Sequence, residues 1–110
     1  MNTRLIIADS ERDPNLLYAT RFFAPDPFIF LEKKGRKIIV LNDLEIDRGR
    51  VQAKVDEVVA YSDVAKRAGS NPTFADVAVR FLKEQRVKTA EVPHDFPLLL
   101  ANKLAAAGIT

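Results

Sequence analysis

Short apolar runs alternate with polar breaks along the first sixty residues, a pattern typical of strands joined by turns and short helices. Segment 3–8 contains three consecutive apolar residues, Leu5 to Ile7. A continuous run of this kind favours a strand buried on both faces. The polar stretch 9–14 breaks the pattern, and a helical turn is predicted over 15–20 after Pro14.

A second pair of apolar runs predicts an antiparallel hairpin. Segments 28–31 and 38–41 are rich in β-branched and aromatic residues, and the charged stretch EKKGRK with Gly35 separates them. A glycine-containing turn between two such runs is a hairpin signal. A short helix over 44–53 and a further strand over 55–61 are expected to follow.

The clearest helix is predicted over 73–86. Its apolar residues recur at i, i+3, i+4, i+7 and i+8 and form one stripe, which we expect to pack against the sheet: Phe74, Val77, Ala78, Phe81 and Leu82. Thr73 and Asp76 have capping-box spacing, and Lys83 and Arg86 stand at the C-terminal end, where cations favour the helix dipole.

The remaining segments predict a short strand over 89–92 and a last helix from Pro97 to the terminator Gly108. Together the elements predict an α/β domain with a mixed β-sheet, an antiparallel hairpin and flanking helices. A glycine-terminated helix followed by the β-branched pair Ile109-Thr110 normally leads into a strand. We therefore expect the sequence to be part of a larger protein, or a domain that ends at its linker.

Composition limits the alternatives. The 110 residues are enough for one domain, and 47% hydrophobic with 29% charged residues is ordinary for a globular protein. The formal net charge of +2 is too even to indicate nucleic acid by itself. Cysteine is absent, which excludes disulfides and thiolate chemistry and fits a cytoplasmic location. No apolar run has the length of a signal peptide or a membrane span.

The order of short motifs resembles one family along essentially the whole chain. The sequence has NLLYATRFF at 15–23, then a DPF hairpin, a DLE turn, DEVVAY, and finally VPHDFPLLLANKLAAAGI at 92–109. This order is similar to the N-terminal domain of the creatinase, prolidase and Xaa-Pro aminopeptidase family. The most specific part is 15–23, which resembles the family's asparagine, tyrosine, threonine, glycine and phenylalanine pattern. Arg21 stands where the family commonly has glycine, and a non-glycine residue resists positive φ.

The resemblance implies a ribonuclease H-like three-layer fold over residues 1–110, a single N-terminal-type domain whose catalytic domain is absent. It implies that two divalent metal ions and the hydrolysis of Xaa-Pro bonds belong to that missing domain, so this chain alone is expected to hold no metal and no catalytic residue. The implied role is to form a homodimer or higher oligomer and to shape a peptide-substrate pocket. Whether the substrate is an Xaa-Pro peptide or creatine-like stays open. The alternative is a stand-alone module of the same fold that binds a protein or a small ligand.

The loop at 21–28 is the best candidate for that role. Pro25 and Pro27 restrict its backbone, and a stiff loop can present side chains at low entropic cost. Phe22 and Phe23 are adjacent, so one of them is expected to be exposed or covered by another subunit, unless both pack under the loop. The predicted pocket or interface residues are Arg21, Phe22, Phe23 and Asp26. We expect Asn15 to cap a helix and Tyr18 to bury its ring.

Three other kinds of chemistry are compatible with particular residues. His94 beside Asp95 could act as a base or metal ligand, but a solvated loop histidine is favoured. Carboxylates that follow apolar runs could hold metals in a nuclease, although turn and cap roles are more usual: Asp9, Asp43, Glu45 and Asp63. The basic hairpin tip, with Lys33, Lys34, Arg36 and Lys37, could contact phosphate, but Glu32 and other acids dilute its charge, and no nucleic acid or membrane partner is expected.

Overall fold

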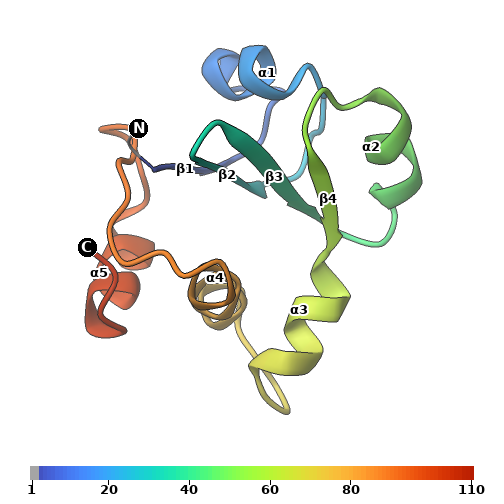
Figure 1. The fold of residues 1–110 in the computed structure, drawn as a ribbon. Coiled ribbons are helices and arrows are strands. Elements are labelled where there is room, and N and C mark those ends of the chain that lie inside the picture. The colour runs from blue at the N-terminus through green and yellow to red at the C-terminus, as the bar shows by residue number, and fades with distance from the viewer. Residues whose placement is uncertain (1–2) are drawn as a thin grey trace.

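A single mixed sheet of four strands organises the chain (Figure 1). The computed structural model describes residues 3–110; Met1 and Asn2, with which the predicted domain begins, lie outside the described residues. The strands are β1 (Arg4–Ala8), β2 (Phe28–Lys33), β3 (Arg36–Leu41) and β4 (Glu57–Ala60), in the order β1-β2-β3-β4. β1 and β3 each pair antiparallel with β2, whereas β4 pairs parallel with β3. The predicted mixed sheet and hairpin are confirmed.

Five helices cover the two faces of this sheet in the described part of the chain. α1 (Pro14–Thr20) and α2 (Ile46–Gln52) lie on one face; α3 (Tyr61–Ala68), α4 (Phe74–Glu84) and α5 (Leu98–Ala106) lie on the other (Figure 1). Four of them were predicted within a few residues of their observed bounds. α3 was not predicted: it begins directly after β4, and Val64 is its single fully buried residue, so its apolar signal is weak.

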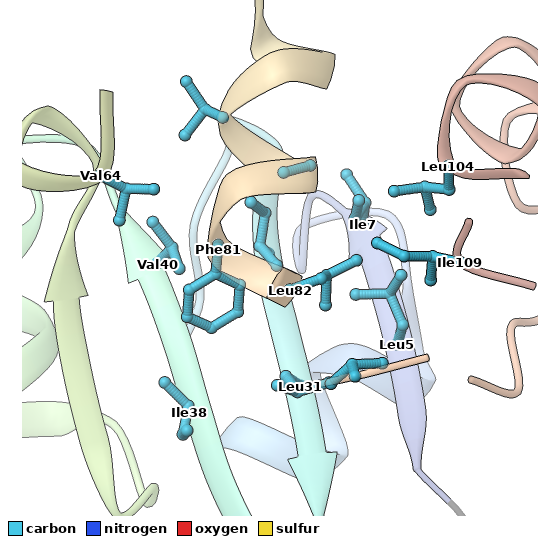
Figure 2. Packing of buried hydrophobic residues seen from close by; sticks show 14 residues of the cluster. Leu5, Ile7, Leu31, Ile38, Val40, Val64, Phe81, Leu82, Leu104 and Ile109 are labelled. Carbon is cyan, nitrogen blue, oxygen red and sulfur yellow. The ribbon is translucent and has the colours of Figure 1, made fainter. Parts of the chain in front are cut away.

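Side chains alternate along each central strand between two hydrophobic cores. In β2, Phe28 and Phe30 join the core under α1 and α2, while Ile29 and Leu31 join the core under α4 and α5. Figure 2 shows the second core, in which Phe81 and Leu82 of α4 lie over the strands. The sheet is therefore buried on both faces, as the continuous apolar runs predicted.

The hairpin between β2 and β3 turns more tightly than predicted. Lys33 pairs with Arg36, so the turn consists of Lys34 and Gly35 rather than the whole stretch 32–37. Both turn residues have positive φ, 53° and 78°. This is the type I′ geometry whose twist matches that of the flanking strands.

The capping box that opens α4 is present as predicted. The Asp76 amide donates to Thr73 Oγ1 (3.1 Å), and the Thr73 amide donates to the Asp76 carboxylate (3.0 Å). These hydrogen bonds from Thr73 hold the pKa of Asp76 below its ordinary value. Val77, Ala78, Phe81 and Leu82 are buried and Phe74 is half-buried, so the predicted stripe is core.

The last third of the chain returns to the β1 edge of the sheet. Glu91 forms an isolated parallel bridge with Arg4, so segment 89–92 lies beside β1, but it is not the strand that was predicted. Thr110 lies on its far side: its amide donates to the Lys88 carbonyl (2.9 Å), and its carbonyl accepts from the Ala90 amide (2.9 Å). Gly108 has φ of 88° and follows α5, as its predicted role as terminator requires. No helix within residues 3–110 has the length and apolarity needed to cross a membrane.

Candidate functional site

The candidate loop begins at Arg21, directly after α1. Arg21 has φ of 55° and ψ of 28°, and its amide donates to the Leu17 carbonyl at 2.7 Å. This is the left-handed conformation in which glycine is favoured. Arginine therefore adopts here the backbone that we expected a non-glycine residue to resist, at a cost of about 1 kcal/mol.

Phe22 anchors the loop in the core. Its side chain is fully buried and packs edge-to-face on Phe28, with ring centroids 6.1 Å apart. The Arg48 guanidinium carbon lies 4.4 Å from the Phe22 ring centroid. α2 also approaches closely, since a β-carbon added at Gly49 would overlap the Leu41 side chain and lie 3.8 Å from Phe22. Phe22 is thus placed beneath the surface that it was predicted to help form.

Phe23 points the other way. Its side chain is 51% exposed, so one of the two adjacent aromatics is exposed as predicted, and the alternative in which both pack under the loop is wrong. Arg21 and Asp26 are exposed as well. The surface of the loop therefore presents a cation, an aromatic ring and a carboxylate.

The buried Ser10 and the half-buried Arg48 fix the loop backbone on both sides of Phe23. Ser10 is 1% exposed; its hydroxyl donates to the Phe22 carbonyl (2.6 Å) and accepts from the Ala24 amide (2.7 Å). Arg48, which is ion-paired with Glu45, donates from Nη1 to the Phe23 carbonyl (2.9 Å). Neither Ser10 nor Arg48 could be identified from the sequence, because single polar residues in a turn and on a helix carry no pattern that singles them out.

Two predictions about α1 are wrong. Tyr18 is 70% exposed rather than buried, because Leu16, Ala19 and Thr20 form the core-facing side of this short helix. The cap is Asp13, whose carboxylate accepts from the Leu16 amide (3.0 Å), and not Asn15. Pro14 occupies the first helical turn, so the cap precedes it.

The exposed Tyr18 connects the loop to a groove. The Arg21 guanidinium carbon lies 4.4 Å from the Tyr18 ring centroid. On its other side Tyr18 lines a groove of about 640 Å³ between α1, β1 and segment 91–95. Charged residues of both signs line this groove, among them Arg4, Arg12, Asp9 and Asp95, and the exposed His94 lies beside them. The sequence could not indicate it, because its lining comes from segments that are far apart along the chain.

The carboxylates that could serve metal or nuclease chemistry do not converge on one site. Asp43 accepts from Ser62 (2.8 Å), Glu45 pairs with Arg48, and Asp9 accepts from the Arg12 amide (3.2 Å). Each of these carboxylates therefore makes a local contact. Among residues 3–110, no group of three or more histidine, cysteine, aspartate or glutamate side chains could hold a metal ion.

Most of the basic hairpin tip is engaged within the molecule. Lys33 Nζ donates to the Gln85 carbonyl (2.7 Å), Lys37 Nζ donates to the Ala19 carbonyl (3.0 Å), and Arg36 pairs with Glu57 (2.7 Å). These contacts fix the tip against α4, α1 and β4. Lys34, at the turn itself, is exposed.

Comparison with known proteins gives the fold but no close relative. No protein-family model matches the sequence, and no curated protein matches it. Solved structures do match. The prolidase from Pyrococcus furiosus is 11% identical with a TM-score of 0.66, and the match covers 99% of this chain and 27% of that one. The Xaa-Pro dipeptidase from Bacillus anthracis is 14% identical with a TM-score of 0.70, covering 96% of this chain and 26% of that one.

A Xaa-Pro aminopeptidase structure from Streptococcus pyogenes also matches, at 13% identity and a TM-score of 0.67; the match covers 99% of this chain and 74% of that one. The chain thus spans about a quarter of the prolidase and dipeptidase chains. The resemblance predicted from the motifs is confirmed: the fold is that of the N-terminal domain of prolidases and Xaa-Pro aminopeptidases.

Proposed function

We propose that this chain is a non-catalytic N-terminal domain of a Xaa-Pro dipeptidase- or aminopeptidase-like metallopeptidase. In this proposal the loop at 21–28 contributes to oligomer contacts and to the substrate pocket of the intact protein. One observation supports it: the structural match to these peptidases covers 96–99% of the chain. The intact protein would then be a cytoplasmic homodimer, its two divalent metal ions would lie in a separate catalytic domain, and this domain would keep the ribonuclease H-like topology.

The exposed Phe23 on a rigid backbone is the observation that carries the proposed role of the loop. Ser10 and Arg48 hold the peptide groups on both sides of Phe23. A ring whose backbone is already ordered loses little entropy when a partner or substrate covers it. Aromatic side chains on ordered surfaces are favoured anchors of interfaces and pockets. Arg21 and Asp26 would supply the charges at the edge of this contact, and Phe22 would anchor the loop from below.

This role predicts a defect in substrate binding when the loop surface is changed. In the natural protein that contains this sequence, Phe23→Ala should raise KM for a Xaa-Pro peptide about tenfold and leave kcat within about twofold, because a binding contact and not a catalytic group is lost. Arg21→Gly tests the charge of Arg21 without changing the backbone, because glycine adopts the left-handed conformation and carries no cation. This substitution should also raise KM.

Leu99→Ala is the matched control, because Leu99 is also an exposed apolar residue but lies on α5, on the opposite face of the sheet. It should leave KM unchanged. Unchanged KM in both loop variants would refute the role of the loop.

The groove favours a second candidate, a stand-alone module that binds a protein segment or a small ligand. Its lining combines cations and carboxylates with the exposed ring of Tyr18, which fits a zwitterionic ligand such as a short peptide. The two candidates differ in whether the natural polypeptide also contains a peptidase domain.

A further inference from the structure

A corner of the molecule away from the loop and the groove concentrates positive charge. A hollow of about 380 Å³ lies between the C-terminal ends of α4 and α5. Three basic residues line it, Lys83, Arg86 and Lys88, together with apolar residues that include Val87 and Ala107. No acidic residue of the described chain is part of this lining.

The hairpin tip adds to the same corner. Lys33 Nζ donates to the carbonyl of Gln85 (2.7 Å) and lies 3.4 Å from that of Arg86, so the β2–β3 turn lies against the C-terminal end of α4. Lys34, the next residue in this turn, is exposed.

Nearby carboxylates do not neutralise this charge. Glu84 pairs with Arg67 (2.7 Å) and Arg80 (2.9 Å), and Glu32 pairs with Arg4 (2.9 Å). Within residues 3–110, none of the four exposed cations forms an ion pair: Lys34, Lys83, Arg86 and Lys88. The C-terminal ends of α4 and α5 each carry only about half a negative charge from the helix dipole, which is small beside four cations.

Backbone conformation singles out two of these residues. Lys34 has φ of 53° and Arg86 has φ of 59°. Glycine or asparagine would adopt this conformation at lower cost. Lys34 lies in the hairpin turn and Arg86 follows the C-cap of α4, so both occupy positions where this conformation is common, and each does so at a cost of about 1 kcal/mol.

We propose that this basic corner is a docking surface for an acidic segment of a partner protein. Carboxylates of the segment would contact the cations around the hollow, and an apolar side chain would enter between Val87 and Ala107. Charge complementarity identifies the partner, since the lining contains cations and apolar residues and no acid. A single-stranded nucleic acid fits less well, because no aromatic residue lines the hollow and bases would have no ring on which to stack. The proposal is independent of the proposed role of the loop.

The test uses the whole chain and a fluorescein-labelled peptide of alternating glutamate and leucine, followed by anisotropy at low salt. The corner variant combines Lys83→Gln, Arg86→Asn and Lys88→Gln; asparagine is chosen because it tolerates the left-handed backbone. The control variant combines Arg50→Gln, Lys54→Gln and Lys66→Gln, which are exposed, lie outside the hollow and change the net charge equally. The peptide should bind the natural sequence and the control alike, and should bind the corner variant at least about tenfold more weakly.

Three results would overturn the proposal: equal binding of the same peptide with glutamine in place of glutamate, an equal loss of affinity in the control variant, or absence of binding to the natural sequence. A short single-stranded DNA that binds this corner more tightly than the acidic peptide would show that the class of partner is wrong. Circular dichroism of each variant establishes that the fold is retained, so that weaker binding reports the loss of charge.

Discussion

Replacing Phe22 by alanine is expected to lower the free energy of unfolding by about 3–5 kcal/mol, the range for truncating a fully buried aromatic residue. Phe22 is entirely buried, packs edge-to-face on Phe28 and carries the Arg48 guanidinium over its ring. Truncation would open a cavity under the loop and remove both ring contacts. The loss is a large fraction of the stability of a domain of this size.

Phe23→Ala provides the matched control, because it removes the same side chain one residue further along. Phe23 is 51% exposed, so its truncation should cost less than about 1 kcal/mol. Urea denaturation followed by far-ultraviolet circular dichroism measures both values. Similar costs for the two substitutions would contradict the assignment of one ring to the core and the other to the surface. Phe22→Leu, which leaves a smaller cavity, extends the comparison if Phe22→Ala does not fold.

Ser10→Ala is expected to lower the free energy of unfolding by about 1–3 kcal/mol. This is more than the truncation of a small side chain typically costs. The Ser10 hydroxyl is buried, donates to the Phe22 carbonyl (2.6 Å) and accepts from the Ala24 amide (2.7 Å). Without it, the buried Ala24 amide has no acceptor, and an unsatisfied buried donor is costly. The loop should therefore loosen on both sides of Phe23.

Hydrogen exchange at the Ala24 amide tests this loosening directly. Ser10→Ala should speed exchange at Ala24 by more than the global loss of stability accounts for, because the opening is local. Ser70→Ala, at an exposed serine before α4, should leave both exchange and stability unchanged within about 0.5 kcal/mol. Protection of the Ala24 amide that survives in Ser10→Ala would show that the loop is held by other contacts.

The elements that could be predicted from sequence are those whose structure is determined by residues within the element itself. Lys34-Gly35 supplies two positive φ angles between two apolar runs, so the hairpin follows from local chemistry. α4 combines an apolar stripe with the Thr73 capping box, and both signals agree. The fold itself was recognised although the identities to the matched structures are only 11–14%. The resemblance rests on the order of short motifs, and these motifs lie at turns and in the core.

The features that sequence did not reveal depend on contacts between distant segments. α3 follows β4 without a break, so no turn signal marks its start, and Val64 is its one fully buried residue. Tyr18 was predicted to bury its ring, yet its position on α1 directs it outward. The groove exists because the Glu91–Arg4 bridge brings segment 91–95 to β1, a pairing that no local pattern encodes.

The central claim is that this chain is an accessory domain of a metallopeptidase. The most direct test is to isolate the natural polypeptide with an antibody raised against the 110-residue chain, and to measure its mass and its hydrolysis of a Xaa-Pro dipeptide with and without a chelator. We predict a polypeptide several times larger than 12.3 kDa whose hydrolysis the chelator abolishes. A polypeptide of 12.3 kDa without hydrolysis would contradict the claim, and would favour the stand-alone binding module.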